Sequence, residues 1–229
     1  EIAVKMPEVI INGPAGRLEC RYMPGATSDA PTALVLHPEP HKNGTMNNRV
    51  TFATYKLFQA RGYAVMRFNF RGVGRSQGTF EQGDGELADA ATAMDWLQAQ
   101  FPSSNVCWIA GFSFGSWIGM QLMMRRPEIT GFISLSPPAS THDFTFLAPC
   151  PASGLIVQGS ENEQVPAQRV QALVEKISKQ KGVVIDVDMI DGANHFFSTH
   201  LDEAMVAVTR YLDRTDDGRD MPSDLPDPK

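Results

Sequence analysis

The chain lacks the features that several kinds of protein require. It has only three cysteines, Cys20, Cys107 and Cys150, and none of them has the C-x-x-C spacing of a zinc or redox site. This odd number and wide spacing argue against a disulfide framework, so we expect reduced thiols and a cytoplasmic protein. The first residues contain no basic segment followed by a long apolar run, so we expect no secretory signal.

Positive charge is also scarce. The chain has 20 Lys and Arg against 26 Asp and Glu, which gives a net charge of −6 with neutral histidines. A nucleic-acid partner would require a basic face, so we expect none. The arginines Arg67, Arg71 and Arg75 form one basic cluster, which we interpret as a solvated loop rather than an anion site.

One segment has the length of a membrane span. No charged residue lies between Asp95 and Arg125, and residues 105–124, NVCWIAGFSFGSWIGMQLMM, are mostly apolar. A span needs ~20 such residues. This segment, however, contains two serines, a glutamine and interior glycines. A strand, a sharp turn and a helix explain it better, so we expect no membrane contact.

Strand-like and helix-like segments alternate along the chain. Apolar runs predict an opening hairpin and then six strands, at 8–13, 17–23, 32–38, 63–70, 106–112, 131–137, 154–160 and 183–190. Helical spacing predicts helices at 47–62, 85–101, 114–126, 166–182 and 200–214. The pattern predicts an α/β fold, a mostly parallel doubly wound sheet of about eight strands with helices on both faces.

A single domain is predicted over residues 1–214, followed by a tail over residues 215–229. The tail sequence, TDDGRDMPSDLPDPK, is acidic and proline-rich with little to bury. Between the strands at 131–137 and 154–160 only a short proline-rich connection remains. It leaves no room for a cap domain, so a site at this edge would be open to water.

The sequence GFSFG, residues 111–115, matches the nucleophile elbow G-x-S-x-G. It follows an apolar strand and opens a helix, as that motif requires. Ser113 would occupy a strained turn, and Gly111 and Gly115 would remove side chains that collide across it. The alternative interpretation is a glycine-rich packing turn. We predict that Ser113 is a nucleophile.

A serine nucleophile needs a base, and the chain has five histidines. His195 follows a predicted strand and precedes the last helix, so it would lie at the carboxyl edge of the sheet, where ligands bind in open α/β folds. His200 is expected at the surface and His142 in a polar loop. His37 and His41 flank Glu39 in a proline-rich loop, a poor set of metal ligands. We predict His195 as the base and no metal.

Two backbone N–H groups should hold the oxyanion. One is the amide of Phe114, directly after the nucleophile. The other should come from the loop after the third strand, HPEPHKNGTM, where Pro38 and Pro40 have no N–H. That leaves Glu39 as the predicted donor, with His41 as the next choice.

With these motifs together, the chain resembles an α/β-hydrolase from about residue 8 to 214. The resemblance rests on LHPEP, FNFRGVGRSQG, GFSFG, QGSENEQVP and GANHFF, each placed after a predicted strand. Within the superfamily the chain is similar to small, lidless bacterial serine hydrolases of the dienelactone-hydrolase-like group. Dienelactone hydrolase uses a cysteine nucleophile where this chain has Ser113. Relatives commonly carry a second histidine where this chain has Glu39.

The resemblance also implies where the catalytic acid belongs. Relatives usually have G-x-x-D-x-x-V-P in the loop where this chain has GSENEQVP. Asn162 therefore occupies the acid position. An asparagine could accept a hydrogen bond from His195 Nδ1–H through its amide oxygen, but it supplies no negative charge. Glu161, Glu163 and Asp143 are the candidate substitutes. Whether one of them acts stays open.

These features predict a serine hydrolase that cleaves a small carboxylic ester or thioester, with no cofactor and no metal. The expected partner is a small-molecule ester, and short acyl chains are expected because no cap would cover a long one. Two alternatives remain: a catalytically degenerate homologue that binds without turnover, motivated by Asn162 and Glu39, and a peptidase-type hydrolase. The oligomeric state does not follow from the sequence.

Overall fold

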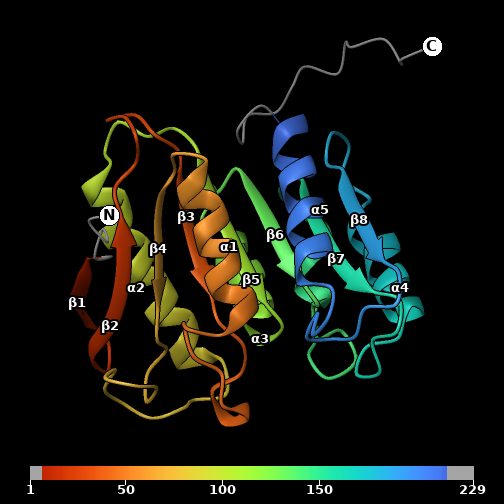
Figure 1. Ribbon diagram of the computed structural model, residues 1–229, viewed down its shortest axis with the longest axis horizontal. Coiled ribbons are helices and arrows are strands. Elements are labelled where there is room, and N and C mark those ends of the chain that lie inside the picture. The colour runs from red at the N-terminus through yellow and green to blue at the C-terminus, as the bar shows by residue number, and fades with distance from the viewer. Residues whose placement is uncertain (1–6, 216–229) are drawn as a thin grey trace.

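The computed structural model describes residues 7–215 and folds them around one sheet with helices on both faces (Figure 1). The strands are β1 (Glu8–Gly13), β2 (Gly16–Met23), β3 (Thr32–Leu36), β4 (Ala64–Phe68), β5 (Cys107–Phe112), β6 (Gly131–Leu135), β7 (Gly154–Gly159) and β8 (Ile185–Ile190). The helices are α1 (Arg49–Ala60), α2 (Asp84–Gln100), α3 (Phe114–Arg125), α4 (Ala167–Ile177) and α5 (Leu201–Arg214), with short 3₁₀ helices η1 (Pro40–Lys42) and η2 (Thr145–Leu147).

The strand order fixes the edge on which a site can form. The order is β1-β2-β4-β3-β5-β6-β7-β8, and β1 and β2 pair antiparallel. β2 is also antiparallel to β4, whereas all pairs from β4 to β8 are parallel. The carboxyl ends of these six strands therefore meet at one edge, the lower edge in Figure 1. Ligands bind outside such an edge in open α/β folds.

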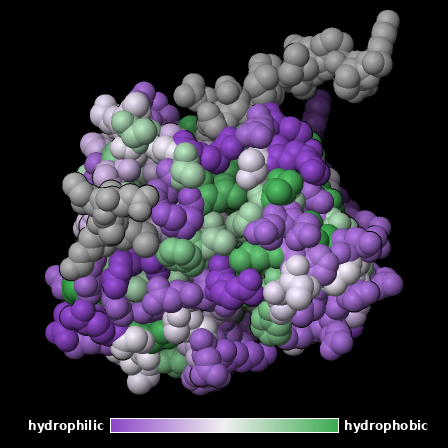
Figure 2. Space-filling view, viewed as in Figure 1, coloured by the Kyte–Doolittle hydropathy of each residue, from purple (hydrophilic) through white to green (hydrophobic). Residues whose placement is uncertain are grey.

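Two apolar layers enclose the sheet. One packs α2, α3, α4 and the connection through η2 against one face. The other packs α1 and α5 against the opposite face. The inner strands β3 to β7 are buried at every position, because both of their faces are covered. Figure 2 shows the face of α1 and α5, where apolar colour gathers in the middle and polar colour surrounds it.

The predicted fold class is confirmed, and all predicted strands and helices are present. The largest difference is α4, which ends at Ile177 rather than near residue 182. Residues 178–182, SKQKG, offer no apolar side chain to bury, so they leave the helix. The described residues contain no cap domain, because only η2 interrupts the connection between β6 and β7. The predicted tail, apart from Thr215, lies outside the described residues.

The apolar stretch at 105–124 becomes β5, the turn at Ser113 and α3, as predicted. Within residues 7–215 no helix combines the length and the apolarity needed to cross a bilayer.

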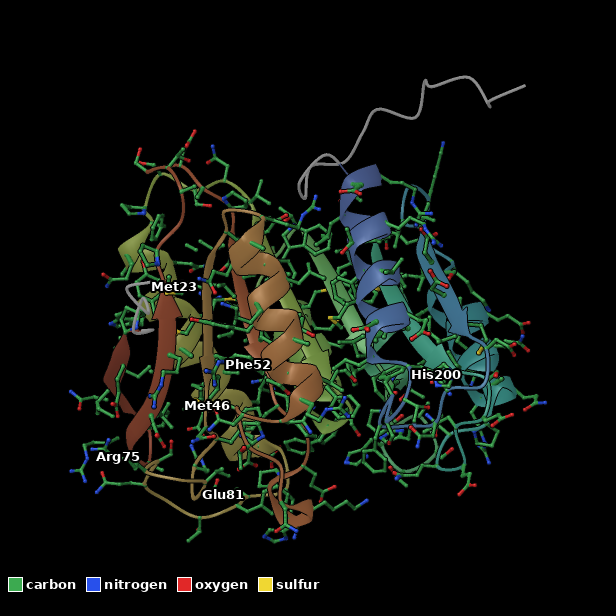
Figure 3. The ribbon with its side chains drawn as sticks, in the orientation of Figure 1. Met23, Met46, Phe52, Arg75, Glu81 and His200 are labelled. Carbon is green, nitrogen blue, oxygen red and sulfur yellow. The ribbon has the colours of Figure 1, made fainter. Side chains whose placement is uncertain are left out.

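The interpretation of the arginine cluster as a solvated loop is wrong for two of its members. Arg67 and Arg71 are only 3% and 4% exposed. The Arg67 guanidinium lies 5.1 Å from the ring centroid of Phe52 and donates to the carbonyl oxygen of Met46 at 3.0 Å. Figure 3 shows Met46 and Phe52 close to each other in front of β4. A count of charged residues does not predict which arginines are buried, because burial depends on partners far away in the chain.

Candidate active site

The nucleophile elbow lies between β5 and α3. Ser113 has φ 52° and ψ −120°, a strained conformation for a residue other than glycine. A Cβ on Gly111 would lie 2.4 Å from the carbonyl carbon of Gly115. A Cβ on Gly115 would lie 2.3 Å from the carbonyl oxygen of Leu36 in β3. Only glycines fit on both sides of the turn, which lifts Ser113 above the strand ends.

His195 reaches Ser113 from the loop after β8. Its Nε2 lies 2.9 Å from Ser113 Oγ, and the residue is 4% exposed. The ring is positioned by contacts with Phe112 and Phe196, at centroid distances of 5.8 and 5.1 Å. Ser136 Oγ donates to the His195 carbonyl oxygen at 2.7 Å and so fixes the backbone of this loop. The structure thus joins the predicted nucleophile and base.

Asn162 meets the other side of the imidazole, but in the opposite orientation to the prediction. Its Nδ2 lies 2.9 Å from His195 Nδ1. Its Oδ1 already accepts from the backbone N–H groups of Gln164 and Val165, both at 3.0 Å. Turning the amide round would point its N–H groups at those two donors and lose both hydrogen bonds. The predicted acceptance by the amide oxygen is therefore wrong, because the tight turn after Asn162 occupies that oxygen.

This orientation determines the tautomer of the histidine. Asn162 Nδ2 can only donate, so His195 Nδ1 accepts and the neutral ring carries its hydrogen on Nε2. The Nε2–H group then donates to Ser113 Oγ. A general base needs the reverse arrangement, with the free lone pair on Nε2. The resting pair is in contact but holds its proton on the wrong nitrogen.

The three predicted substitute acids do not take the place of Asn162. Glu161 and Glu163 are exposed, and neither hydrogen-bonds to His195. Asp143 accepts from the backbone N–H and the Oγ1 of Thr145, at 2.9 and 3.0 Å. In the described part of the chain, the side-chain hydrogen bonds of the His195 ring go only to Ser113 and Asn162.

The electrostatics of the site favour a neutral ring. Burial and, to a lesser degree, the positive charge of Lys42 lower the pKa of His195 from 6.5 to about 4. No carboxylate offsets this, since the neighbour at Nδ1 is an uncharged amide. An imidazolium at this position would therefore be poorly stabilised.

The predicted oxyanion donors line the same small pocket as the nucleophile. Ser113, Phe114, Glu39 and His195 all border a cavity of about 80 Å³. Phe114 is the first residue of α3 and Glu39 precedes η1. Among the described residues, neither backbone N–H has an acceptor. Both are thus available to an oxyanion, as the predicted roles require.

A histidine that the sequence analysis did not use holds the Glu39 loop. His37 is fully buried at the end of β3. Its Nδ1 donates to the carbonyl oxygen of Pro38 at 2.7 Å, and its Nε2 accepts from the backbone N–H of Phe70 at 3.0 Å. Burial lowers its pKa from 6.5 to about 4. The neutral ring therefore ties the loop after β3 to the loop after β4.

The other histidines lie at the edge of the site or outside it. His142 is half-buried and borders the pocket, with its ring centroid 4.6 Å from that of Trp117. Its place in a polar loop gave no signal of this. His200 directly precedes α5, as Figure 3 shows, and it does not border the pocket at Ser113. Within residues 7–215, no three His, Cys, Asp or Glu side chains are grouped so that they could hold a metal ion.

Comparison with known families and curated proteins gives three relevant matches. The family model described as X-Pro dipeptidyl-peptidase (S15 family) matches residues 17–216. An uncharacterised protein of Rickettsia prowazekii is 49% identical over 211 residues, which are 90% of this chain and 89% of that protein. A lysophosphatidylserine lipase of Rattus norvegicus is 27% identical over 179 residues, which are 69% of this chain but only 44% of the lipase.

Solved structures match over nearly the whole chain. A protein of unknown function from Agrobacterium tumefaciens is 54% identical, with a TM-score of 0.91 and coverage of 95% of this chain and 100% of that one. An α/β serine hydrolase homologue from Coxiella burnetii is 32% identical, with a TM-score of 0.83 and coverage of 93% and 100%. A lidless α/β serine hydrolase from Xanthomonas campestris is 30% identical, with a TM-score of 0.82 and coverage of 93% and 96%. None of these relatives is described as a dienelactone hydrolase.

Proposed function

This chain belongs to the X-Pro dipeptidyl-peptidase (S15) family of the α/β-hydrolase superfamily, and we propose that it cleaves a small carboxylic ester or thioester through an acyl-enzyme on Ser113. The observation that carries the proposal is the contact of 2.9 Å between Ser113 Oγ and His195 Nε2 on a strained elbow. Strain of this kind persists at sites where chemistry uses it.

In the proposed reaction, Ser113 Oγ attacks the carbonyl carbon and His195 Nε2 takes its proton. The amides of Phe114 and Glu39 stabilise the tetrahedral oxyanion. His195 then gives the proton to the leaving alcohol or thiol, which departs as the carbonyl reforms. Water attacks the acyl-enzyme with the same help from His195 and releases the acid. No cofactor or metal takes part.

Asn162 makes the proposed enzyme slow. Before Nε2 can accept a proton, the hydrogen of the neutral ring must move to Nδ1, where it would face the N–H of Asn162. The imidazolium meets the same repulsion during acyl transfer. In serine proteases, an Asp-to-Asn change at the acid position lowers kcat by ~10⁴. A degenerate homologue without turnover is the limiting case of this effect.

Small, unhindered esters fit the site better than esters of long chains. The pocket at Ser113 is small, about 80 Å³, and no cap in the described chain covers it. Each methylene group that is not buried against an apolar surface loses ~0.8 kcal/mol of favourable binding free energy. We would compare kcat/KM for p-nitrophenyl esters from acetyl to dodecanoyl, with Ser113→Ala as the background. Activity should fall toward dodecanoyl, the longest and least covered chain, and vanish in Ser113→Ala. Wild-type rates in Ser113→Ala would refute the proposal.

A peptidase is the second candidate, and the family match is the observation that favours it. Amide hydrolysis has the higher barrier, because the amine leaves only after His195 has taken the proton of Ser113 and delivered it to the nitrogen. A ring with a pKa of about 4 and no adjacent carboxylate is a weak base for the first of these transfers. We would assay dipeptidyl p-nitroanilides with proline in the second position beside the esters. Cleavage of these anilides at rates comparable to the esters would favour the peptidase.

The cellular setting is part of the proposal. We propose a cytoplasmic enzyme with a small-molecule substrate and neither a nucleic-acid nor a membrane partner. Three free, buried cysteines and a net charge of −6 support this view. Fractionation of cells that express the full-length protein would test it.

A further inference from the structure

A second, larger cavity lies beside the active site. It has a volume of about 490 Å³ and is formed by α4 and the connection between β6 and β7. Small-molecule sites commonly have volumes of ~300–1,000 Å³. The pocket at Ser113, about 80 Å³, is too small to hold more than the reacting group. None of the catalytic roles proposed above uses the larger cavity.

His142 connects the two spaces, because its side chain borders both of them. Its ring centroid lies 6.1 Å from that of Phe114, the residue after the nucleophile. Ala139 borders the larger cavity, and Pro138 borders the smaller one. The two cavities are thus neighbours on either side of His142.

The wall of the larger cavity is apolar at its base. Phe144, Leu173 and Ile177 border it and are themselves buried in the core. Such a surface favours a short hydrocarbon chain, because removing apolar area from water is favourable. This apolar part of the cavity wall would not by itself distinguish a charged molecule from a neutral one.

Its rim carries an excess of positive charge. Arg169, Lys176 and Lys179 border the cavity on the α4 side, and among the described residues none of them forms an ion pair within 4 Å. The hydrogen bonds from Thr145 and, to a lesser degree, the charge of Lys176 lower the pKa of Asp143, so Lys176 has this one carboxylate nearby. The one acidic residue on the rim, Asp143, is hydrogen-bonded to Thr145 through both carboxylate oxygens. Three cations against one carboxylate is a local excess of positive charge in a chain with a net charge of −6.

We propose that this cavity binds the far end of the substrate, an apolar chain of several carbons that ends in a carboxylate or a phosphate. The ester lies at Ser113, the chain passes His142, and the terminal anion meets Arg169 and Lys176. This inference rests on the proposed function and adds a substrate class to it. It concerns a binding site and predicts preference among esters, not a further reaction.

Direct binding tests the cavity without relying on turnover. Octanoate and the uncharged octanamide would be titrated into the full chain by calorimetry at low ionic strength. Octanoate should bind at least roughly fivefold more tightly, and about 0.5 M NaCl should largely remove the difference, because salt screens exposed charges. Octyl phosphate identifies the preferred anion, and tighter binding of either anion supports the proposal. Equal binding of octanoate, octyl phosphate and octanamide would overturn it.

Two variants localise the binding. Lys176→Met should remove most of the preference for octanoate, whereas Lys56→Met, at an exposed position of α1 on the other face, should keep it. Ala172→Trp should fill the cavity and abolish octanoate binding, whereas Gln171→Trp, which does not border the cavity, should bind as wild type does. Each variant needs a melting curve like that of wild type. Octanoate binding unchanged in a folded Ala172→Trp would place the ligand elsewhere and refute the proposal.

Hydrolysis separates this inference from the proposed function. Wild type should cleave the p-nitrophenyl monoester of octanedioic acid, which has a free terminal carboxylate, faster than p-nitrophenyl octanoate. If both esters are cleaved at the same kcat/KM and octanoate shows no preferential binding, the cavity assignment fails and the hydrolase stands. If neither ester is cleaved but octanoate binds at the cavity, the proposed function fails and the anion site stands.

Discussion

At the scale of single residues, the site depends on which atom of Asn162 faces His195. Two backbone N–H groups, from Gln164 and Val165, hold the amide oxygen and leave the NH₂ group toward the ring. An aspartate would keep both backbone hydrogen bonds with one oxygen and accept from His195 Nδ1–H with the other. The loop is thus shaped for a carboxylate but contains an amide.

Asn162→Asp should raise kcat at least tenfold and up to ~10⁴-fold, because the carboxylate selects the Nδ1–H tautomer and stabilises the imidazolium. Steady-state kinetics with p-nitrophenyl acetate measure the change. Glu161→Gln, Glu163→Gln and Asp143→Asn are the matched controls and should leave kcat within about twofold. If one of the controls abolishes activity while Asn162→Asp gains nothing, that carboxylate is the catalytic acid. The orientation of the Asn162 amide toward His195 then has no effect on catalysis.

The pH profile of the wild type should reflect the lowered pKa of His195. The ring stays neutral down to a pKa of about 4, so the acid limb of kcat/KM should lie near that pH rather than near 6.5. In Asn162→Asp the adjacent negative charge stabilises the imidazolium, so the acid limb of kcat/KM should move to higher pH. Far-UV circular dichroism at each pH controls for unfolding. An acid limb near pH 7 in the folded wild type would contradict the assigned environment.

The sequence predicted the serine and histidine of the site, because the elbow motif and the loop after a strand are local signals. It placed Asn162 at the acid position by resemblance, and the structure brings that residue to His195. It could not give the orientation of the amide, which depends on two backbone donors in a turn. It also missed His37 and His142, whose contacts come from distant segments.

At the scale of elements, the loops at the strand ends are held by buried polar contacts. Arg71, after β4, donates to Asp89 of α2 through its backbone N–H, Nε and a terminal nitrogen, at 3.0, 3.0 and 2.8 Å. The two side chains are 5% and 0% exposed. This pair fixes the loop after β4, which also donates to His37 through Phe70.

Arg71→Met should destabilise the fold by about 3–5 kcal/mol, because it leaves the Asp89 carboxylate buried without its partner. Urea denaturation at neutral pH gives the free energy of unfolding. Arg75→Gln is the control, since Arg75 is 69% exposed and pairs with Glu8 at the surface. It should cost no more than about 1 kcal/mol. If both variants lose the same free energy of unfolding, burial does not determine how much the Arg71–Asp89 pair contributes to stability.

Periodicity predicted every strand and helix of the fold, because buried strands and amphipathic helices leave a repeating mark in the sequence. Their ends were less certain. Helix α4 stops at Ile177, where its last buried side chain lies, although helix-forming residues continue. The burial of Arg71 had no local signal, since this residue lies in the glycine-rich loop after β4, whereas Arg67 lies among apolar neighbours within β4 itself.

At the scale of the whole molecule, the fold depends on histidines that are neutral when buried. His37 and His195 both have a pKa lowered to about 4, chiefly by burial. In the unfolded chain each would take up a proton near pH 6.5. Between pH 6.5 and 4 the unfolded state therefore binds more protons, and the folded state loses stability as the pH falls.

The free energy of unfolding should decrease from pH 7 to pH 4.5, with each histidine contributing up to roughly 3 kcal/mol over its full window. His37→Gln removes one of the two groups and should reduce this dependence, although it lowers stability at pH 7. Urea titrations at the two pH values measure both quantities. His200→Gln, at a partly exposed position, is the control. The same pH dependence in wild type and His37→Gln would show that His37 is not buried neutral.

The most direct test of the whole account is covalent labelling of Ser113. A fluorophosphonate should attach to one residue of the native full-length protein, and peptide mass spectrometry should locate the adduct at Ser113. Labelling should be lost in Ser113→Ala, strongly slowed in His195→Ala and accelerated in Asn162→Asp. A folded wild-type protein that stays unlabelled, or that is labelled equally in Ser113→Ala, would contradict the proposal that Ser113 is an activated nucleophile.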